Sequence, residues 1–117
     1  ITDRKKEIIV NLGGDNISPS KIENLLCLND KIKQSFVYGD KKTYLVAIIV
    51  TENIENIKEI EFYLENLNKT LSLVEKVKKF KLIEEEFTID NGMLTPTLKL
   101  KRKKILDKYK DDLEKLY

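Results

Sequence analysis

Residues 44–50, YLVAIIV, form the longest uninterrupted apolar run of the chain and constrain its fold more than any other segment. A strand has two faces, so a run without a polar position is buried on both of them. Residues 32–38 are also rich in strand-forming side chains, and the polar loop at residues 39–42 has the length of a hairpin connection. We therefore predict an antiparallel hairpin near residues 32–50, with its second strand inside the domain.

Periodic apolar positions predict the elements around this hairpin. Ser18 and Pro19 form a typical helix start, with a hydroxyl cap followed by proline at the first helical position. Helices are expected at residues 18–28, 54–67 and 71–77 and from residue 101 onward, and further strands at residues 7–11 and 82–89. The order βαββααβα mixes hairpins with crossovers, which indicates the α+β class: a small domain with a central, mostly antiparallel sheet flanked by about three to four helices.

Composition excludes several classes of protein. The 117 residues suit one small domain, and a seven-residue apolar run is far below the roughly 20 residues that span a bilayer. The single Cys27 permits no internal disulfide, and without histidine the usual zinc ligand sets and an imidazole base are missing. Because 22 basic and 20 acidic side chains leave a net charge of +2, there is no overall attraction to nucleic acid. We therefore expect a cytoplasmic domain that binds neither metal nor nucleic acid.

Three segments could carry chemistry, and each also has a plainer interpretation. The loop at residues 13–16 (GGDN) could bring bare backbone close to a ligand, or it could be an ordinary turn. The basic run at residues 99–104 (KLKRKK) could contact phosphates, or it could be a solvated helix face. The three glutamates at residues 84–86 are best explained as a solvated strand edge, and Cys27 as a small apolar side chain on a helix face.

Two segments near opposite ends of the chain carry a family resemblance. DRKKE at residues 3–7 leads into GGDNISP at residues 13–19, and LTPTLKLKR occupies residues 94–102, about 90 residues beyond the first motif. Together they strongly resemble the C-terminal domain of AMP-forming acyl-CoA synthetases, specifically the long-chain fatty acid branch. The resemblance covers the whole chain, and the order and spacing of the two motifs make it specific.

The resemblance implies a reaction in two steps. Members of the family join a fatty acid to ATP, which gives acyl-adenylate and diphosphate, and then rotate the C-terminal domain so that the thiol of CoA displaces AMP. Residues 1–117 would be that mobile lid, starting at the interdomain hinge, without the N-terminal domain that binds ATP, Mg2+ and the acyl chain. The isolated lid is expected to be inactive and to hold no cofactor. Its partner would be its own N-terminal domain, and the whole enzyme could associate peripherally with a membrane.

The same resemblance implies roles for individual residues. Lys99 matches the lysine that enters the active site during adenylation, where an ammonium on a flexible stem can neutralise charge on the α-phosphate. Arg4 matches a nucleotide-binding arginine, and Lys6 matches the hinge residue between the two domains. Gly13 and Gly14 match the loop that swings in beside the CoA tunnel for the second step. No position matches a metal ligand.

Three further positions bear on the match. Leu98 stands where many relatives carry glycine directly before the catalytic lysine, although the long-chain branch commonly lacks that glycine. Val10 stands where some relatives place a lysine for thioester formation, a role that valine cannot perform. Glu23 also matches a motif position and is expected in a structural helix contact.

Other functions stay open from the sequence. One is an adenylate-forming ligase with a different acyl substrate, because the acyl chain is selected in the other domain. Another is a basic module that uses residues 99–104 to bind nucleic acid or an anionic membrane. A third, an inactive relative kept for interactions, is disfavoured by the presence of Lys99 and Arg4.

Overall fold

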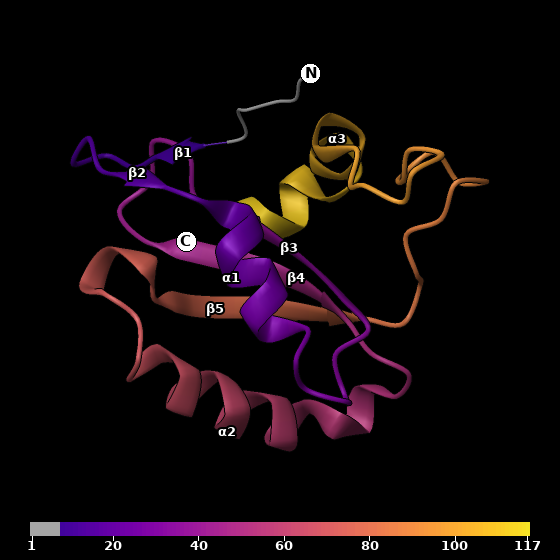
Figure 1. Cartoon of the computed structure of the whole chain (residues 1–117), viewed down its shortest axis with the longest axis horizontal. Coiled ribbons are helices and arrows are strands. Elements are labelled where there is room, and N and C mark those ends of the chain that lie inside the picture. The colour runs from indigo at the N-terminus through magenta and orange to yellow at the C-terminus, as the bar shows by residue number, and fades with distance from the viewer. Residues whose placement is uncertain (1–7) are drawn as a thin grey trace.

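Three α-helices and two small sheets make up residues 8–117, the part of the chain that the computed structural model describes (Figure 1). The elements are, in order, β1 (Ile9–Val10), β2 (Asn16–Ile17), α1 (Pro19–Leu26), β3 (Gln34–Tyr38), β4 (Leu45–Val50), α2 (Ile57–Asn68), β5 (Val77–Ile83) and α3 (Arg102–Glu114). Short 3-10 turns, Ile54–Asn56 and Leu73–Glu75, precede α2 and β5. The predicted α+β class is confirmed. None of the helices in this range has both the length and the apolar character needed to cross a membrane.

The strand β4 lies in the middle of the larger sheet, whose order is β3-β4-β5. β3 runs antiparallel to it, with Gln34 opposite Val50 and Tyr38 opposite Val46, which confirms the predicted hairpin. β5 pairs with the other side of β4 in the parallel direction, because the chain crosses over through α2 between the two strands. All six residues of β4 are buried, as the apolar run requires.

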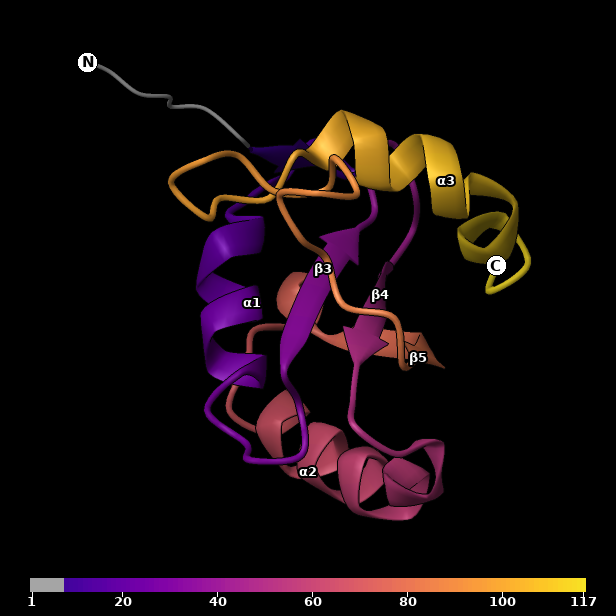
Figure 2. The ribbon, with the colours of Figure 1, turned by 90° about the vertical axis from the view of Figure 1, so that its right-hand side faces the viewer.

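Alternate side chains of β4 supply two separate hydrophobic cores, one on each face of the sheet. Leu45, Ala47 and Ile49 pack with residues of α1 and α2. The other three residues of β4 pack with α3 and with the segment at residues 87–94. The sheet is therefore the middle of three layers, and Figure 2 shows α1 and α3 on opposite sides of β3 and β4.

The helix predicted at residues 71–77 is wrong. Ser72 and Glu75 form a reciprocal capping box, but it encloses only the single 3-10 turn before β5. The side chain of Asn68 then holds both backbone groups of Val77, accepting from its N–H at 3.1 Å and donating to its carbonyl at 2.9 Å. These side-chain contacts turn the chain into β5 before a helix can continue.

The strand predicted at residues 82–89 is wrong beyond Ile83, where β5 ends. The glutamates at residues 84–86 are exposed, as expected, but they have left the sheet. The side chain of Gln34 replaces strand pairing further on, because it accepts from the Phe87 N–H at 2.7 Å and donates to the Phe87 carbonyl at 3.0 Å. Phe87 is thereby fixed in the core without belonging to a strand.

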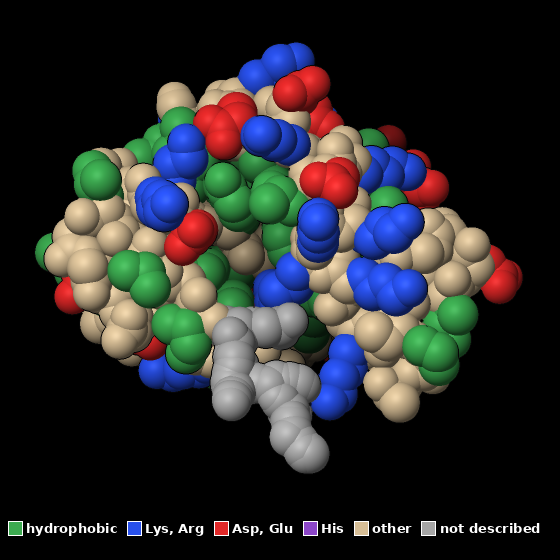
Figure 3. Space-filling view, turned by 90° about the horizontal axis from the view of Figure 1, so that it is seen from above, with side chains coloured by type: hydrophobic (Ala, Val, Ile, Leu, Met, Phe, Trp, Pro, Cys, Tyr) green, Lys and Arg blue, Asp and Glu red, His purple; other side chains and the backbone are tan. Residues whose placement is uncertain are grey.

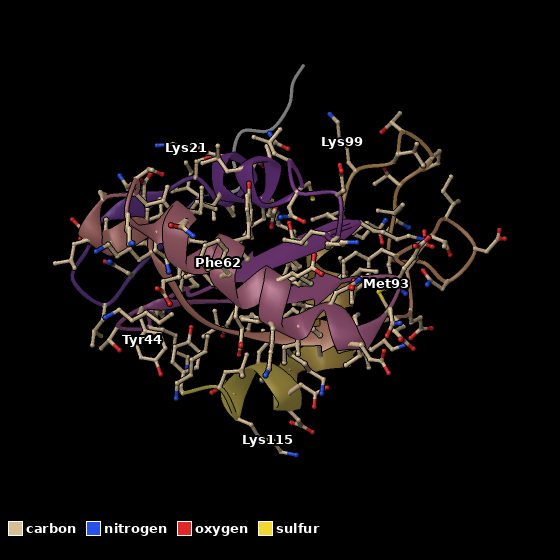
Figure 4. All side chains as sticks on the ribbon, turned by 90° about the horizontal axis from the view of Figure 1, so that it is seen from below. Lys21, Tyr44, Phe62, Met93, Lys99 and Lys115 are labelled. Atoms are coloured by element: carbon tan, nitrogen blue, oxygen red, sulfur yellow. The ribbon has the colours of Figure 1, made fainter. Side chains whose placement is uncertain are left out.

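We expect the 117-residue chain to unfold in one cooperative transition, and we expect Ile49→Ala to lower its free energy of unfolding by about 2–5 kcal/mol. Ile49 is fully buried in β4, so the substitution leaves a cavity in the core. Phe62→Ala is the control, because Phe62 projects from α2 and is 69% exposed (Figure 4). That control is expected to change the free energy by about 0.5 kcal/mol or less. Urea denaturation measures both, and equal losses would contradict the buried position of β4.

Candidate functional site

Lys99 lies on a short hairpin, residues 93–101, that leads directly into α3. The two sides of the hairpin are joined at Thr95, whose N–H donates to the Lys99 carbonyl at 2.8 Å and whose hydroxyl accepts from the Lys99 N–H at 3.1 Å. Behind this pair, Leu94 and Leu100 form an antiparallel bridge. The backbone of Lys99 is therefore held in a defined place, although the residue belongs to no regular strand or helix.

Leu98 turns the tip of this hairpin with a φ of +66°. Its N–H donates to the Thr95 carbonyl at 2.8 Å, which closes a tight turn, and its side chain is 68% exposed. Glycine is the usual residue at such a left-handed position, because a side chain there costs roughly 1–2 kcal/mol. The conformation gives a physical reason for the glycine that the family resemblance places before the lysine, and it shows that a leucine can hold the same turn.

The ammonium group of Lys99 is exposed, and the side chain points away from the body of the domain (Figure 4). Among residues 8–117 it has no hydrogen-bond or ion-pair partner. Lys33 differs, because its ammonium contacts Glu86 at 3.0 Å and this hydrogen bond raises the pKa of Lys33. Lys99 is therefore a cation on a fixed backbone whose charge is available to a group outside the described structure.

A partly buried ion pair lies at the base of the hairpin. The guanidinium of Arg102, the first residue of α3, donates two hydrogen bonds to the carboxylate of Glu23 in α1, one of them at 2.8 Å. The same carboxylate accepts from the Val37 N–H of β3 at 2.8 Å. Glu23 is only 7% exposed, so its carboxylate depends on such contacts in place of water. The helix contact expected for Glu23 is present, but the sequence did not indicate its partner 79 residues away.

Two hollows flank this ion pair. The larger has a volume of about 720 Å³ and a mixed lining that includes Ser20, Asn24, Gln34, Leu94, Thr95 and Lys99. The smaller, of about 200 Å³, is apolar and includes Ile9, Phe36, Val37, Tyr38 and Leu106 in its lining. Figure 3 looks onto the face that carries β1, β2 and α3, and shows a hollow with hydrophobic side chains beside a gathering of Lys and Arg.

Gly13 and Gly14 lie in the turn of a separate hairpin between β1 and β2. The strand expected at residues 7–11 is present as the two-residue β1, and its partner β2 was not predicted. Gly14 has a φ of +84°, and the Asn11 side chain closes the turn by accepting from the Asp15 N–H at 2.8 Å. In Figure 1 this turn lies at the opposite end of the domain from the hairpin that precedes α3, so the structure does not bring the two glycines and Lys99 together.

Cys27 has no features of a nucleophile. The residue is exposed at the end of α1, but its sulfur lies 3.5 Å from the Ser35 hydroxyl. Partial burial raises the pKa of the thiol and the nearby Glu23 charge raises it further, whereas the Ser35 contact acts in the opposite direction. A thiol with a raised pKa is mostly protonated at neutral pH and reacts slowly.

Two of the predicted site residues, Arg4 and Lys6, lie outside the described residues, so their roles stay predictions. Within residues 8–117 there is no group of three or more Cys, Asp or Glu side chains placed to hold a metal ion. The described part of the candidate site therefore consists of the hairpin that presents Lys99, the ion pair beneath it, and the distant glycine turn.

The known proteins that this chain resembles in sequence share one family. A sequence profile described as the AMP-binding enzyme C-terminal domain matches residues 6–117. The long-chain fatty acid–CoA ligase FadD15 of Mycobacterium tuberculosis is 33% identical over 141 aligned residues, which cover 100% of this chain and 24% of that protein. The human long-chain fatty acid–CoA ligase 1 is 32% identical over 100% of this chain and 20% of its own length. The chain therefore spans about a quarter or less of these curated relatives.

Solved structures with the same fold include adenylation domains. The adenylation domain of a carboxylate reductase from Mycobacterium chelonae has a TM-score of 0.85 and 28% identity, over 98% of this chain and 20% of that one. The corresponding domain from Segniliparus rugosus, solved in complex with AMP and a co-purified carboxylic acid, has a TM-score of 0.85 and 27% identity over the same shares of both chains.

We expect Leu98→Gly to raise the free energy of unfolding by up to about 1 kcal/mol, because glycine removes the cost of a side chain at positive φ. Leu12→Gly is the matched control, since Leu12 is also 68% exposed but has no left-handed backbone. The control is expected to lose about 0.5–1 kcal/mol through the added freedom of the unfolded chain. Urea denaturation of the two variants measures both changes in the free energy of unfolding. An equal loss in both would show that the backbone at Leu98 is not strained.

Proposed function

This chain belongs to the family of AMP-binding enzyme C-terminal domains, and from that membership we propose that it is the mobile lid of a long-chain fatty acid–CoA ligase. The proposal covers residues 1–117 as one domain that follows an interdomain hinge. The ligase names of FadD15 and of the human relative support the substrate class. The match covers only 24% of FadD15, which supports a separate N-terminal domain that would bind ATP and the acyl chain.

The observation that carries the proposal is the placement of Lys99. Its backbone is held by the hairpin while its ammonium is exposed and unpaired among residues 8–117. When the acyl carboxylate attacks the α-phosphate of ATP, negative charge develops on the phosphate and bridging oxygens. A positioned ammonium stabilises that charge in the transition state, which is where a catalytic contact has most effect.

The second half-reaction would use the other end of the domain. Rotation about the hinge at Lys6 would withdraw Lys99 and bring the turn at Gly13 and Gly14 beside the CoA tunnel. The absence of Cβ atoms on this turn supports a close approach of backbone to the pantetheine chain. Val10 is 41% exposed on β1, and its apolar side chain offers no proton or charge to the thioester step.

The described residues do not fit a magnesium site, because they hold no suitable cluster of carboxylates. We therefore assign Mg2+, like most of the nucleotide contacts, to the N-terminal domain and derive no step through it. Arg4 is the nucleotide contact proposed for this domain. The cytoplasmic location and a peripheral association with a membrane stay predictions for the whole enzyme.

We expect Lys99→Ala in the full-length enzyme to slow acyl-adenylate formation about a hundredfold or more, because it removes a charge contact made in the transition state. Thioester formation from supplied acyl-adenylate and CoA is expected to continue at close to the unaltered rate. Diphosphate release with fatty acid and ATP measures the first step, and acyl-CoA production measures the second.

Lys110→Ala serves as the control for that substitution, since Lys110 is an exposed lysine on α3 and is not assigned to the site. Normal diphosphate release by Lys99→Ala would refute the assignment of Lys99. Activity with short or aromatic acids in place of long-chain acids would leave the lid mechanism standing and change the substrate class.

A further inference from the structure

Resting on the role proposed for Lys99, we propose that the Glu23–Arg102 ion pair positions Lys99 for adenylation, with Glu23 as a positioning residue of that half-reaction. Glu23 does not reach the reacting atoms itself. It acts through Arg102, which stands three residues beyond Lys99 and begins α3.

The leading side of the hairpin is held by the hydrophobic core. Met93 and Leu94 are buried together with Phe87, in the core that α3 and one face of β4 share. The Asn91 side chain, just before them, accepts from the Met93 N–H at 3.0 Å. This side therefore has apolar anchors that do not depend on the ion pair.

The returning side, which carries Lys99, has weaker attachment. Lys99 and Lys101 are exposed and Leu100 is half-buried. The backbone of this side is joined to the leading side through Thr95 and through the Lys101 N–H, which donates to the Met93 carbonyl at 2.8 Å. Arg102 is the next residue, and it is fixed on two sides: its fork binds both carboxylate oxygens of Glu23, and its guanidinium lies 5.7 Å from the centre of the Phe36 ring. The ion pair is accordingly the contact that attaches this side directly to α1 and, through Glu23, to β3.

Glu23 is itself fixed in a way that suits a positioning residue. Its carboxylate accepts from the Val37 N–H, and its backbone carbonyl accepts from the Ser35 hydroxyl at 3.2 Å. Both partners lie on β3, one of the two outer strands of the sheet. The fork of Arg102 thus connects the base of the hairpin to the rigid sheet through a single carboxylate. A displacement of about 1 Å at a catalytic group can cost a hundredfold in rate. Loosening this connection is therefore expected to slow adenylation.

The glycine turn at residues 13–14 is attached independently. The Leu12 N–H donates to the Lys42 carbonyl at 2.9 Å, and the Lys41 N–H donates to the Val10 carbonyl at 2.8 Å. These contacts tie the β1–β2 hairpin to the loop between β3 and β4 and do not involve Glu23 or Arg102. Loosening the ion pair should therefore disturb the adenylation end of the domain and spare the thioester end.

The test uses Glu23→Gln in the full-length enzyme. Glutamine keeps an oxygen that can accept from Val37 but removes the charge that holds the guanidinium. We expect acyl-adenylate formation to fall roughly tenfold to a hundredfold, and thioester formation from supplied acyl-adenylate to fall less than threefold. The ratio of the two rates is the decisive readout, because general destabilisation would lower both in proportion.

Arg102→Lys is the second variant, since lysine keeps the positive charge but cannot bind both carboxylate oxygens in a fork. It is expected to change the ratio in the same direction. Glu85→Gln is the control. Glu85 contacts Lys108 of α3 at 2.9 Å on the exposed side of that helix, so its substitution should leave the ratio unchanged. Hydrogen exchange in Glu23→Gln should accelerate at the amides of Thr95 and Lys101.

Each result has one meaning. Equal losses in both half-reactions, or an unchanged ratio in both Glu23→Gln and Arg102→Lys, would overturn the positioning role even if Lys99→Ala abolishes adenylation. If Lys99→Ala itself leaves adenylation intact, the proposed function of Lys99 fails first. Unchanged exchange at Thr95 and Lys101 together with a lowered ratio would also overturn the inference, because the hairpin would then not have moved.

Discussion

The fold depends on the complete burial of β4. A strand without a polar side chain must be covered on both faces, and the chain meets this requirement with α1 and α2 on one face and α3 on the other. The backbone groups of β4 are also paired on both sides, by β3 and by β5. Every other element of the larger sheet and its two covering layers is therefore placed relative to this strand, which separates one core on each face.

Glu23 and Arg102 connect the two helical layers that β4 separates. The two residues come from helices on opposite faces, and they meet at the outer edge of β3, where Val37 presents an N–H that no strand pairs. The carboxylate satisfies that N–H, and the guanidinium satisfies the carboxylate. This partly buried contact therefore satisfies one backbone group at the edge of β3 and joins the two outer layers. The Lys99 hairpin lies directly at this junction.

The sequence predicts what has a local pattern and misses what does not. The run at residues 44–50 predicts a buried strand and its hairpin partner, because a strand buried on both faces has no polar position. The turn at Leu98 lacks the glycine that normally indicates a left-handed position, so its hairpin was missed. The prediction placed the strand β5 too late in the chain. The side chain of Asn68 binds the backbone of Val77 at the start of β5, and the side chain of Gln34 binds the backbone of Phe87 beyond its end. Such contacts between distant residues leave no periodic signal.

A lid that serves two half-reactions must present two different surfaces without changing its own shape. The two candidate surfaces here, the Lys99 hairpin and the turn at Gly13 and Gly14, are both attached to β3 or to the loop that follows it, but through separate contacts. A rotation at the hinge would then move both surfaces as one body and exchange one for the other. A fork of two hydrogen bonds suits this task better than a single ammonium contact, because it fixes orientation as well as distance. That difference explains why one of the two arginines in a chain with 20 lysines stands at this junction.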